Sequence, residues 1–143
     1  MRKDSRLSRV LHVLVHLDVP ETPVTSDKMA DMLSTNPVVV RRTMALLREQ
    51  GFVQSAKGHN GGWSLAKPLH QITLLDIHKA LGNGSIFNIG LTDEHTQCRI
   101  EHAVNAALRD VMDEAENLML KRFGEVTLDV LGDGFQSSLT AHS

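Results

Sequence analysis

Apolar residues recur at helical spacing in three stretches near the start of this chain, and two shorter apolar stretches follow them. Positions three or four residues apart are apolar over 5–17, 26–33 and 37–50, which predicts three helices, each with one face toward a core. The stretches 52–56 and 63–66 predict two strands. The expected inner positions of the helices are Leu7, Val10, Leu11, Leu14, Leu17, Met29, Ala30, Met32, Leu33, Val40, Met44 and Leu47, with Ala45 as a further candidate.

Capping residues stand at the ends that these patterns imply. Thr25 or Ser26 can cap the second helix, and Asn36 can cap the third. Pro37 suits the first helical position, where no backbone N–H is needed. Gly51 suits a left-handed residue directly after the third helix. The second and third helices are therefore predicted to be separated only by a tight turn.

A glycine-rich loop, Lys57-Gly58-His59-Asn60-Gly61-Gly62, joins the two predicted strands. The order helix, tight turn, helix and hairpin is that of a winged helix-turn-helix, which places its second helix in the major groove of DNA. A buried helical hairpin with an ordinary β-turn is the alternative interpretation. The Arg41-Arg42 pair and the cationic wing tip favour DNA binding.

The second half of the chain contains two further predicted helices. Thr73 and Asp76 form a capping-box pattern at the start of a helix that ends at Leu81. Residues 99–123 form the longest predicted helix, and residues 127–131 add a short turn or helix. The apolar stripe of the long helix consists of Ile100, Ala103, Val104, Ala107, Val111, Ala115, Leu118 and Met119.

A helix of about 25 residues is roughly 37 Å long, more than a domain of this size can cover. We therefore expect its stripe to pack against a second copy of the chain; packing on the chain's own winged domain is the alternative. The predicted fold is mainly α with a small β-hairpin. It comprises a winged helix-turn-helix domain over 1–81, a linker loop over 82–98, a dimerisation region over 99–131 and a disordered tail over 132–143.

The net charge of −2 is unevenly divided along the chain. Residues 1–67 contain ten lysine or arginine residues and six aspartate or glutamate residues, whereas residues 68–143 contain five and eleven. The basic excess coincides with the predicted DNA-reading elements, and attraction to phosphate acts locally. We expect the acidic half to face away from the duplex.

The composition argues against several other classes of protein. Four Phe, one Trp and no Tyr disfavour a stacking surface for single-stranded nucleic acid. No apolar run approaches a membrane span and no signal peptide is recognisable, so we expect a cytoplasmic protein. A single cysteine allows no internal disulfide. We see no nucleophile elbow, paired carboxylates or phosphate-cradling loop at a helix start, and therefore expect no enzymatic activity.

The predicted DNA contacts lie at the start of the third helix and at the wing tip. Val38 and Val39 can touch thymine methyl groups, and Arg41 or Arg42 can reach guanine or phosphate. The polar wing tip suits the minor groove. The full set is Asn36, Val38, Val39, Arg41, Arg42, Lys57, His59 and Asn60. Because the expected dimer has two-fold symmetry, its partner should be double-stranded DNA with a pseudo-palindromic operator.

A resemblance to a known family is carried by two segments, LREQGFVQSAKGHNGGWSLAKP at 47–68 and ITLLDIHKAL at 72–81. They resemble the Rrf/IscR-type winged-helix repressors of bacteria, which include iron–sulfur cluster regulators and the cysteine-metabolism repressor. The resemblance runs from about residue 6 to 131 and weakens after Gly82. It implies a homodimeric regulator whose long C-terminal helices cross at the dimer interface.

The chain departs from the cluster-binding members of that family before the long helix. Those members carry three cysteines in this loop, where the present chain has only Cys98. The resemblance therefore implies a branch that lacks a cysteine-ligated cluster, and we expect no cofactor.

Cys98 is a candidate sensing thiol. It precedes a predicted helix and stands next to Arg99, and both features favour the thiolate. Oxidation, alkylation or a mixed disulfide there could move the dimer helices relative to the wings. The alternative is a half-buried cysteine that packs in the interface.

Two groups of residues could in principle bind a metal. His95, Cys98 and His102 offer a thiolate and two imidazoles, but their spacing matches no recognised signature. His12 and His16 have the spacing of a metal-binding pair, and without a third ligand we interpret them as surface or half-buried histidines. We therefore predict no metal site.

Taken together, these features predict a DNA-binding transcriptional regulator. We expect a homodimeric repressor that responds to a small molecule or to thiol redox chemistry. The alternatives are a winged-helix module that binds protein without binding DNA, and a metal-binding sensor. Positive charge at Arg41, Arg42 and Lys57 favours DNA, because a wing that docks on protein does not need it.

Overall fold

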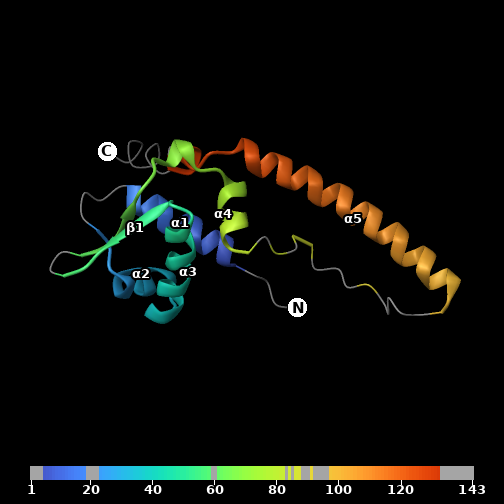
Figure 1. The fold of residues 1–143 in the computed structure, drawn as a ribbon, viewed down its shortest axis with the longest axis horizontal. Coiled ribbons are helices and arrows are strands. Elements are labelled where there is room, and N and C mark those ends of the chain that lie inside the picture. Colours follow the sequence, from blue (N-terminus) through green and yellow to red (C-terminus); the bar gives the residue numbers. More distant parts are fainter. Residues whose placement is uncertain are drawn as a thin grey trace, which may run out of the picture.

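A computed structural model describes residues 5–18, 23–58, 61–82, 84, 86–87, 91 and 97–132 of the 143-residue chain. Helices α1 to α4 and a hairpin form one body, from which the long helix α5 extends (Figure 1). The predicted fold class is confirmed. The elements in order are α1 (Arg6–Asp18), α2 (Ser26–Leu33), α3 (Pro37–Glu49), β1 (Val53–Ala56), β2 (Gly62–Leu65), the 3-10 helix η1 (Leu69–Gln71), α4 (Leu74–Ala80) and α5 (Arg99–Glu125).

The core is built from the inner faces of the helices that the apolar spacing predicted. Leu14 of α1, Met29 of α2 and Leu47 of α3 are completely buried. Each such side chain stabilises the fold by about 1.5–3 kcal/mol relative to full exposure. Because helical periodicity alone selects the face of an amphipathic helix, these positions could be predicted without knowledge of their partners.

The predicted N-caps are confirmed. The side-chain oxygens of Thr25 and Asn36 accept hydrogen bonds from the backbone N–H three residues further on, at 3.2 and 3.0 Å. Thr73 and Asp76 form a complete capping box at the start of α4, with both hydrogen bonds at 3.0 Å. Each cap uses N–H groups that the first turn of a helix leaves without partners.

The end of α3 sets the path into the hairpin. Gly51 has φ of +81°, as predicted for the residue after this helix. Its N–H donates to the carbonyl of Arg48, and the N–H of Phe52 donates to the carbonyl of Leu47, both at 3.0 Å. These two bonds are those of a Schellman motif. Phe52 is buried beside the helix end, so the chain leaves α3 in a defined direction.

The hairpin is antiparallel, with Val53 opposite Leu65 and Ala56 opposite Gly62. Val24, just before α2, pairs with it from the other side: its N–H donates to the carbonyl of Trp63 at 3.0 Å, and the reverse bond is 2.8 Å. The sequence analysis assigned no strand there, because one paired residue has no periodicity to detect. This pairing attaches the wing to the start of α2.

The chain after α5 returns to the winged domain. Leu74 donates a backbone hydrogen bond to Val126 at 3.0 Å, and Leu128 donates one to Ile72 at 2.9 Å. Leu128 is completely buried in the core. This short segment belongs to the predicted dimerisation region 99–131, and within one chain it packs against the winged domain.

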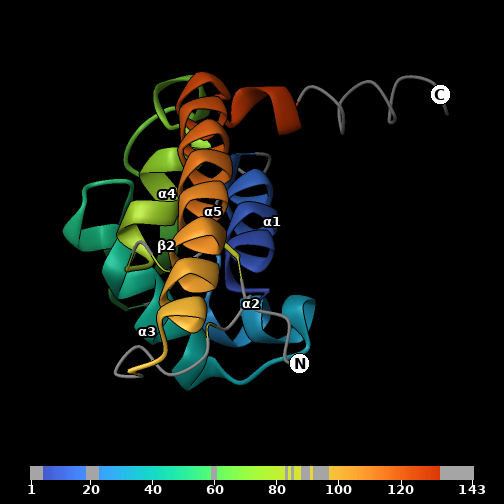
Figure 2. The same ribbon diagram turned by 90° about the vertical axis from the view of Figure 1, so that its right-hand side faces the viewer.

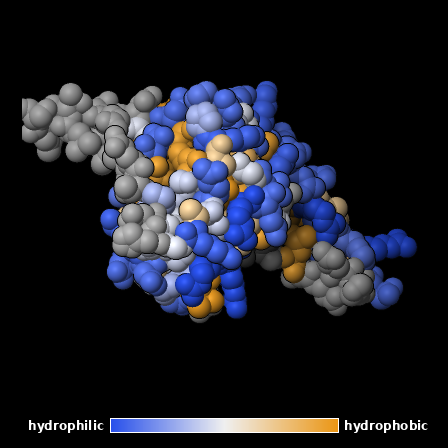
Figure 3. Space-filling view, turned by 60° about the vertical axis from the view of Figure 1, so that its left-hand side comes forward, coloured by the Kyte–Doolittle hydropathy of each residue, from blue (hydrophilic) through white to orange (hydrophobic). Residues whose placement is uncertain are grey.

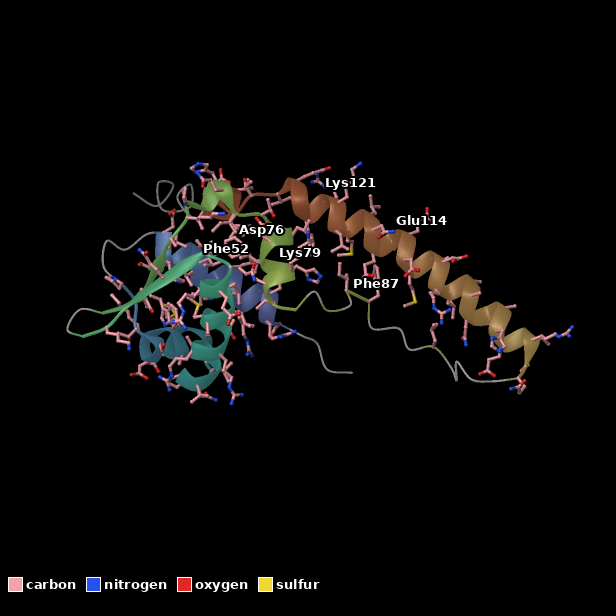
Figure 4. All side chains as sticks on the ribbon, viewed as in Figure 1. Phe52, Asp76, Lys79, Phe87, Glu114 and Lys121 are labelled. Carbon is pink, nitrogen blue, oxygen red and sulfur yellow. The ribbon has the colours of Figure 1, made fainter. Side chains whose placement is uncertain are left out.

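Helix α5 contacts the rest of the chain mainly at its C-terminal end, where Phe123 lies edge-on to His78 of α4 with ring centroids 6.0 Å apart. Nearer its middle, Glu116 accepts a hydrogen bond from the backbone of Ile86 at 3.1 Å, and Phe87 lies on the same side (Figure 4). Figure 2 shows the full length of α5 in front of the winged domain. No helix of the described residues is long and apolar enough to cross a bilayer.

The apolar stripe of α5 remains largely open in the described chain. Ile100 is 76% exposed, Val111 66% and Leu118 63%. Side chains of this kind are usually covered by protein when they form a continuous row. Packing on the chain's own winged domain therefore accounts only for the C-terminal turns of α5. The apolar stripe on the rest of the helix is not covered by the described residues.

Candidate nucleic-acid interface

Helix α3 has one buried face and one open face. Val40, Met44 and Leu47 point into the core. Val38 and Val39, in the first turn, are 48% and 41% exposed. Two branched apolar side chains at the exposed start of a helix can contact a partner without disturbing the core.

Arg41 and Arg42 are exposed one turn further along α3. In the part of the chain that the structure describes, neither has an ion-pair partner. Asn36 is exposed as well, and its Oδ1 accepts the capping hydrogen bond from Val39, while its amide nitrogen makes no hydrogen bond that the described residues show. Of these three predicted DNA contacts, Arg41 and Arg42 are thus free to bind a ligand, whereas Asn36 also caps α3.

The turn between α2 and α3 holds the two helices at a fixed distance. Ser34 adopts the left-handed conformation, with φ of 53°. Its N–H donates to Asp31 at 3.4 Å, and the N–H of Thr35 donates to Ala30 at 3.0 Å. The turn therefore closes the end of α2 by hydrogen bonds of its own, and α3 begins two residues after it. A serine gave no signal for this conformation, which glycine usually adopts.

The wing extends beyond the hairpin as a glycine-rich loop. Gly58 has φ of +92°, and its carbonyl accepts a hydrogen bond from Gly61 at 3.0 Å, which narrows the loop. Lys57 is exposed next to this turn. His59 and Asn60, the other predicted wing contacts, lie outside the described residues. The described part of the wing therefore brings one of the three predicted side chains to the surface.

Trp63 joins the wing to both helices of the helix-turn-helix. Its ring is buried, and its Nε1 donates a hydrogen bond to Oγ of Ser26, the first residue of α2, at 2.9 Å. The guanidinium of Arg48 on α3 lies over the ring, 5.6 Å from its centroid. Arg48 also donates to Oγ of Ser55 on β1 at 3.4 Å. These contacts position the wing relative to α3.

An open cleft of about 300 Å³ lies between α2, α3 and the wing. It is lined by Thr25, Ser26 and Asp27 at the start of α2, by Arg41, and by Ser55 and Gly58 of the hairpin. The positive end of the helix dipole and the guanidinium favour an anion in this cleft, whereas the carboxylate of Asp27 opposes one. Arg42 does not line this cleft, so the two neighbouring arginines have different surroundings.

The sequence analysis did not identify Ser26 or Ser55 as part of this surface. Their only signals were a capping position and a polar strand position, and neither indicates which elements meet in space.

On the side of the molecule that carries the wing, the surface is mostly hydrophilic with scattered hydrophobic patches (Figure 3).

Cys98 is exposed at the N-cap of α5, and its carbonyl accepts a hydrogen bond from the N–H of His102 at 3.1 Å. His95 lies outside the described residues. In the described ranges, no group of three or more histidine, cysteine or acidic side chains gathers as a metal site. The thiol is thus accessible in a single chain. It lies directly before the long helix α5, where the sequence predicted it.

His12 and His16 on α1 are closer than their spacing alone required. Their Nε2 atoms lie 2.9 Å apart and their ring centroids 4.7 Å apart. Partial burial, and then the neighbouring His12, lower the pKa of His16 below its ordinary value. At neutral pH His16 is therefore expected to be uncharged.

Comparison with known proteins gives the family. The model of the Rrf2 family, described as an iron-dependent transcriptional regulator, matches residues 4–134. The chain belongs to the Rrf2 family. It is accordingly a transcriptional regulator of this family with a winged-helix fold, and its resemblance to Rrf/IscR-type regulators is confirmed.

Relatives and solved structures agree with this assignment. YffB of Lactococcus lactis, a candidate HTH-type transcriptional regulator, is 31% identical over 129 residues, 89% of this chain and 82% of YffB. A candidate transcriptional regulator from Lactobacillus plantarum has a TM-score of 0.75 at 24% identity, over 96% of this chain and 91% of that one. IscR of T. potens has a TM-score of 0.66 at 21% identity, over 94% and 88%. At these identities the two structures support the fold alone.

The description of the Rrf2 family as iron-dependent raises the question of a cluster in this chain. Iron–sulfur clusters are held by several cysteine thiolates, with histidine as an occasional substitute. The whole sequence contains one cysteine, Cys98. The donor set of one chain therefore does not fit a cysteine-ligated cluster of the usual kind.

Proposed function

We propose that this Rrf2-family protein is a homodimeric repressor that reads DNA with the first two turns of α3 and with its wing. The observation that carries the proposal is the open face of α3, where Val38, Val39, Arg41 and Arg42 are exposed while the opposite face forms the core. The major groove of B-DNA admits a helix of this kind, and the fixed turn before α3 limits how it can enter.

Each residue on this face has a role that follows from its chemistry. Val38 and Val39 offer methyl groups to thymine, and Arg42 can donate two hydrogen bonds to guanine. Arg41 lies in the cleft beside the start of α2, where a phosphate would meet both a guanidinium and a helix N-terminus. Base reading is therefore assigned to the valines and Arg42, and positioning on the backbone to Arg41.

The wing is proposed to follow or enter the minor groove next to α3. Lys57 is exposed at its edge, and the sequence supplies His59 and Asn60 at its tip. Cations and amides suit the narrow and electronegative minor groove. The contacts of Trp63 with Ser26 and Arg48 support a fixed distance between wing and recognition helix.

The test is operator binding by the native chain and by matched variants. A site would first be selected from random duplex DNA, and affinities then measured by fluorescence anisotropy at a fixed salt concentration. Arg42→Ala should cost about 1–3 kcal/mol on the selected site and relax the preference at one base pair. Arg41→Ala should weaken all sequences more evenly. Lys121→Ala on α5 also removes one exposed positive charge and should have little effect.

The outcomes separate the alternatives. If the double replacement of Arg41 and Arg42 leaves affinity unchanged, α3 does not read the operator. If the folded native chain enriches no sequence at all, a winged-helix module for protein contacts becomes the better assignment.

Dimerisation is proposed to occur through the open stripe of α5. Ile100, Val104, Leu108, Val111 and Leu118 are each more than a third exposed and recur along this helix. A second copy could cover the stripe by antiparallel or crossed packing of the same helix. Two recognition helices related by a two-fold axis would then require a pseudo-palindromic operator.

Signal input is proposed at Cys98, at the junction between the linker and α5. The thiol is exposed in the chain, so an electrophile or an oxidised thiol can reach it. An adduct there would disturb the start of α5 and change the spacing of the two recognition helices, and a rigid duplex tolerates little misplacement.

Operator titrations with and without a disulfide oxidant would test the role of Cys98, in the native protein and in Cys98→Ser. Release of DNA by the oxidised native protein alone is the expected result. If mass spectrometry shows Cys98 to be modified while operator affinity persists, the signal enters elsewhere.

A further inference from the structure

His12 and His16 form a pair outside the elements that carry the proposed DNA contacts. They lie one turn apart on α1; His12 is exposed and His16 is half-buried. The two Nε2 atoms approach to 2.9 Å, with the rings tilted by 51° to one another. At this distance the two nitrogens cannot both carry a proton toward each other, so at least one lone pair faces the gap.

The separation of the two nitrogens matches that of ligands on one metal ion. Two imidazole nitrogens at about 2.0–2.1 Å from a metal, at a right angle to each other, lie about 2.9 Å apart. A tetrahedral angle would need about 3.3 Å, which a small rotation of the exposed His12 ring supplies. Two histidines four residues apart on a helix are also the arrangement that holds zinc in helical metalloenzyme motifs.

We propose that His12 and His16 form a two-imidazole binding site for a divalent transition metal ion such as Ni²⁺, Cu²⁺ or Zn²⁺. Imidazole nitrogen suits these ions, whereas Mg²⁺ and Ca²⁺ prefer oxygen ligands. No third protein ligand gathers in the described part of the chain, so water completes the coordination. Such a site exchanges its metal and leaves open positions.

The surroundings of the pair agree with this assignment. The burial that lowers the pKa of His16 favours the uncharged ring, which is the form that binds metal. In the metal-free protein the pair can share one hydrogen bond between the Nε2 atoms. Metal binding moves that proton to Nδ1 and turns both Nε2 lone pairs toward the ion.

Isothermal titration calorimetry of the full chain with NiCl₂ tests the site, and the protein carries no affinity tag. MgCl₂ serves as the negative control, because Mg²⁺ prefers oxygen ligands. Native protein should bind one Ni²⁺ per chain at this site. His12→Ala should weaken that binding by at least about tenfold, because it removes a direct ligand rather than a supporting group. His12 is exposed, so the variant is expected to fold. His70→Ala removes another exposed histidine, from η1, and should bind as the native chain does.

Histidine ring signals in NMR spectra give a second readout. Substoichiometric Ni²⁺ should broaden the ring protons of His12 and His16 before those of His70. Three results would overturn the proposal: no binding by the native chain, equal binding by His12→Ala, or loss of binding in Cys98→Ser, which would place the metal beside α5. A pair that serves only as a hydrogen bond corresponds to either of the first two results.

Discussion

Replacement of Gly62, at the start of β2, should disturb the root of the wing directly. Its φ is +143°, and an added Cβ would lie 2.7 Å from both the carbonyl carbon and the carbonyl oxygen of Val24. Those are backbone atoms, held by the two hydrogen bonds between Val24 and Trp63. They cannot move aside as the end of a flexible side chain can, so Gly62→Ala must shift the strand pairing.

Two costs combine in this variant. A non-glycine residue in a sparsely populated backbone conformation costs about 1–3 kcal/mol. Forcing extra volume against packed neighbours adds typically 1–3 kcal/mol. We therefore expect Gly62→Ala to lower the free energy of unfolding by about 2–6 kcal/mol, a large part of the stability of a small domain.

Two other glycines provide matched controls. Gly58 has φ of +92° and open space around an added Cβ, so Gly58→Ala should carry only the conformational cost. Gly84 has open space and lies outside this φ range, so Gly84→Ala should stay within about 0.5 kcal/mol of the native chain. The three alanine variants thus separate the clash from the backbone strain.

Urea unfolding of the native chain and the three variants, at one protomer concentration, measures these differences. Operator affinity below the unfolding transition measures the consequence for the wing, and Gly62→Ala should bind more weakly than Gly58→Ala. If Gly62→Ala is no less stable than Gly58→Ala, the contact with Val24 does not restrict this position and the reasoning fails.

Four further predictions concern the cap of α3, the wing, the apolar stripe of α5 and the histidine pair. Asn36→Ala should destabilise the protein by about 0.5–2 kcal/mol in thermal denaturation, and Asn36→Ser should recover most of the loss because serine also caps. Lys57→Ala should lower affinity on all DNA sequences and reduce the salt slope by about one unit; an unchanged slope would show that the wing stays off the duplex. Val104→Asp combined with Val111→Asp should give monomers in sedimentation at micromolar concentration, and a persistent dimer would move the interface elsewhere. His16 should titrate below the ordinary histidine value of 6.5 in NMR of the metal-free protein. Because its folded pKa is lowered, the stability it contributes is present above pH 6.5 and is lost as the pH falls through the folded value.

Local features of this chain could be predicted from its sequence because their causes are local. The cap at Asn36 and the left-handed Gly51 each depend on hydrogen bonds within about four residues. The buried faces of α1 and α3 follow from a period of 3.6 residues, which needs no knowledge of the partner surface. The order of these elements was then sufficient to predict the winged helix-turn-helix.

Contacts between segments that are distant in the sequence could be identified only from the tertiary structure. The pairing of Val24 with Trp63 and the burial of Leu128 join segments that have no shared pattern in the sequence. Arg41 and Arg42 are neighbours in the chain, yet only Arg41 lines the cleft beside α2. Successive residues on a helix point about 100° apart, so the environment of each depends on how α3 is packed against the rest of the fold.

The histidine pair combines both kinds of information. Spacing along α1 was visible in the sequence and allowed a metal-binding pair, but it could not give the distance between two flexible rings. The partial burial of His16 and the 2.9 Å approach of the two nitrogens are consequences of packing and side-chain rotamers. The sequence by itself determined which helices form and which faces they bury, because those choices depend on nearby residues. The packed structure decided which side chains meet, because that depends on every element at once.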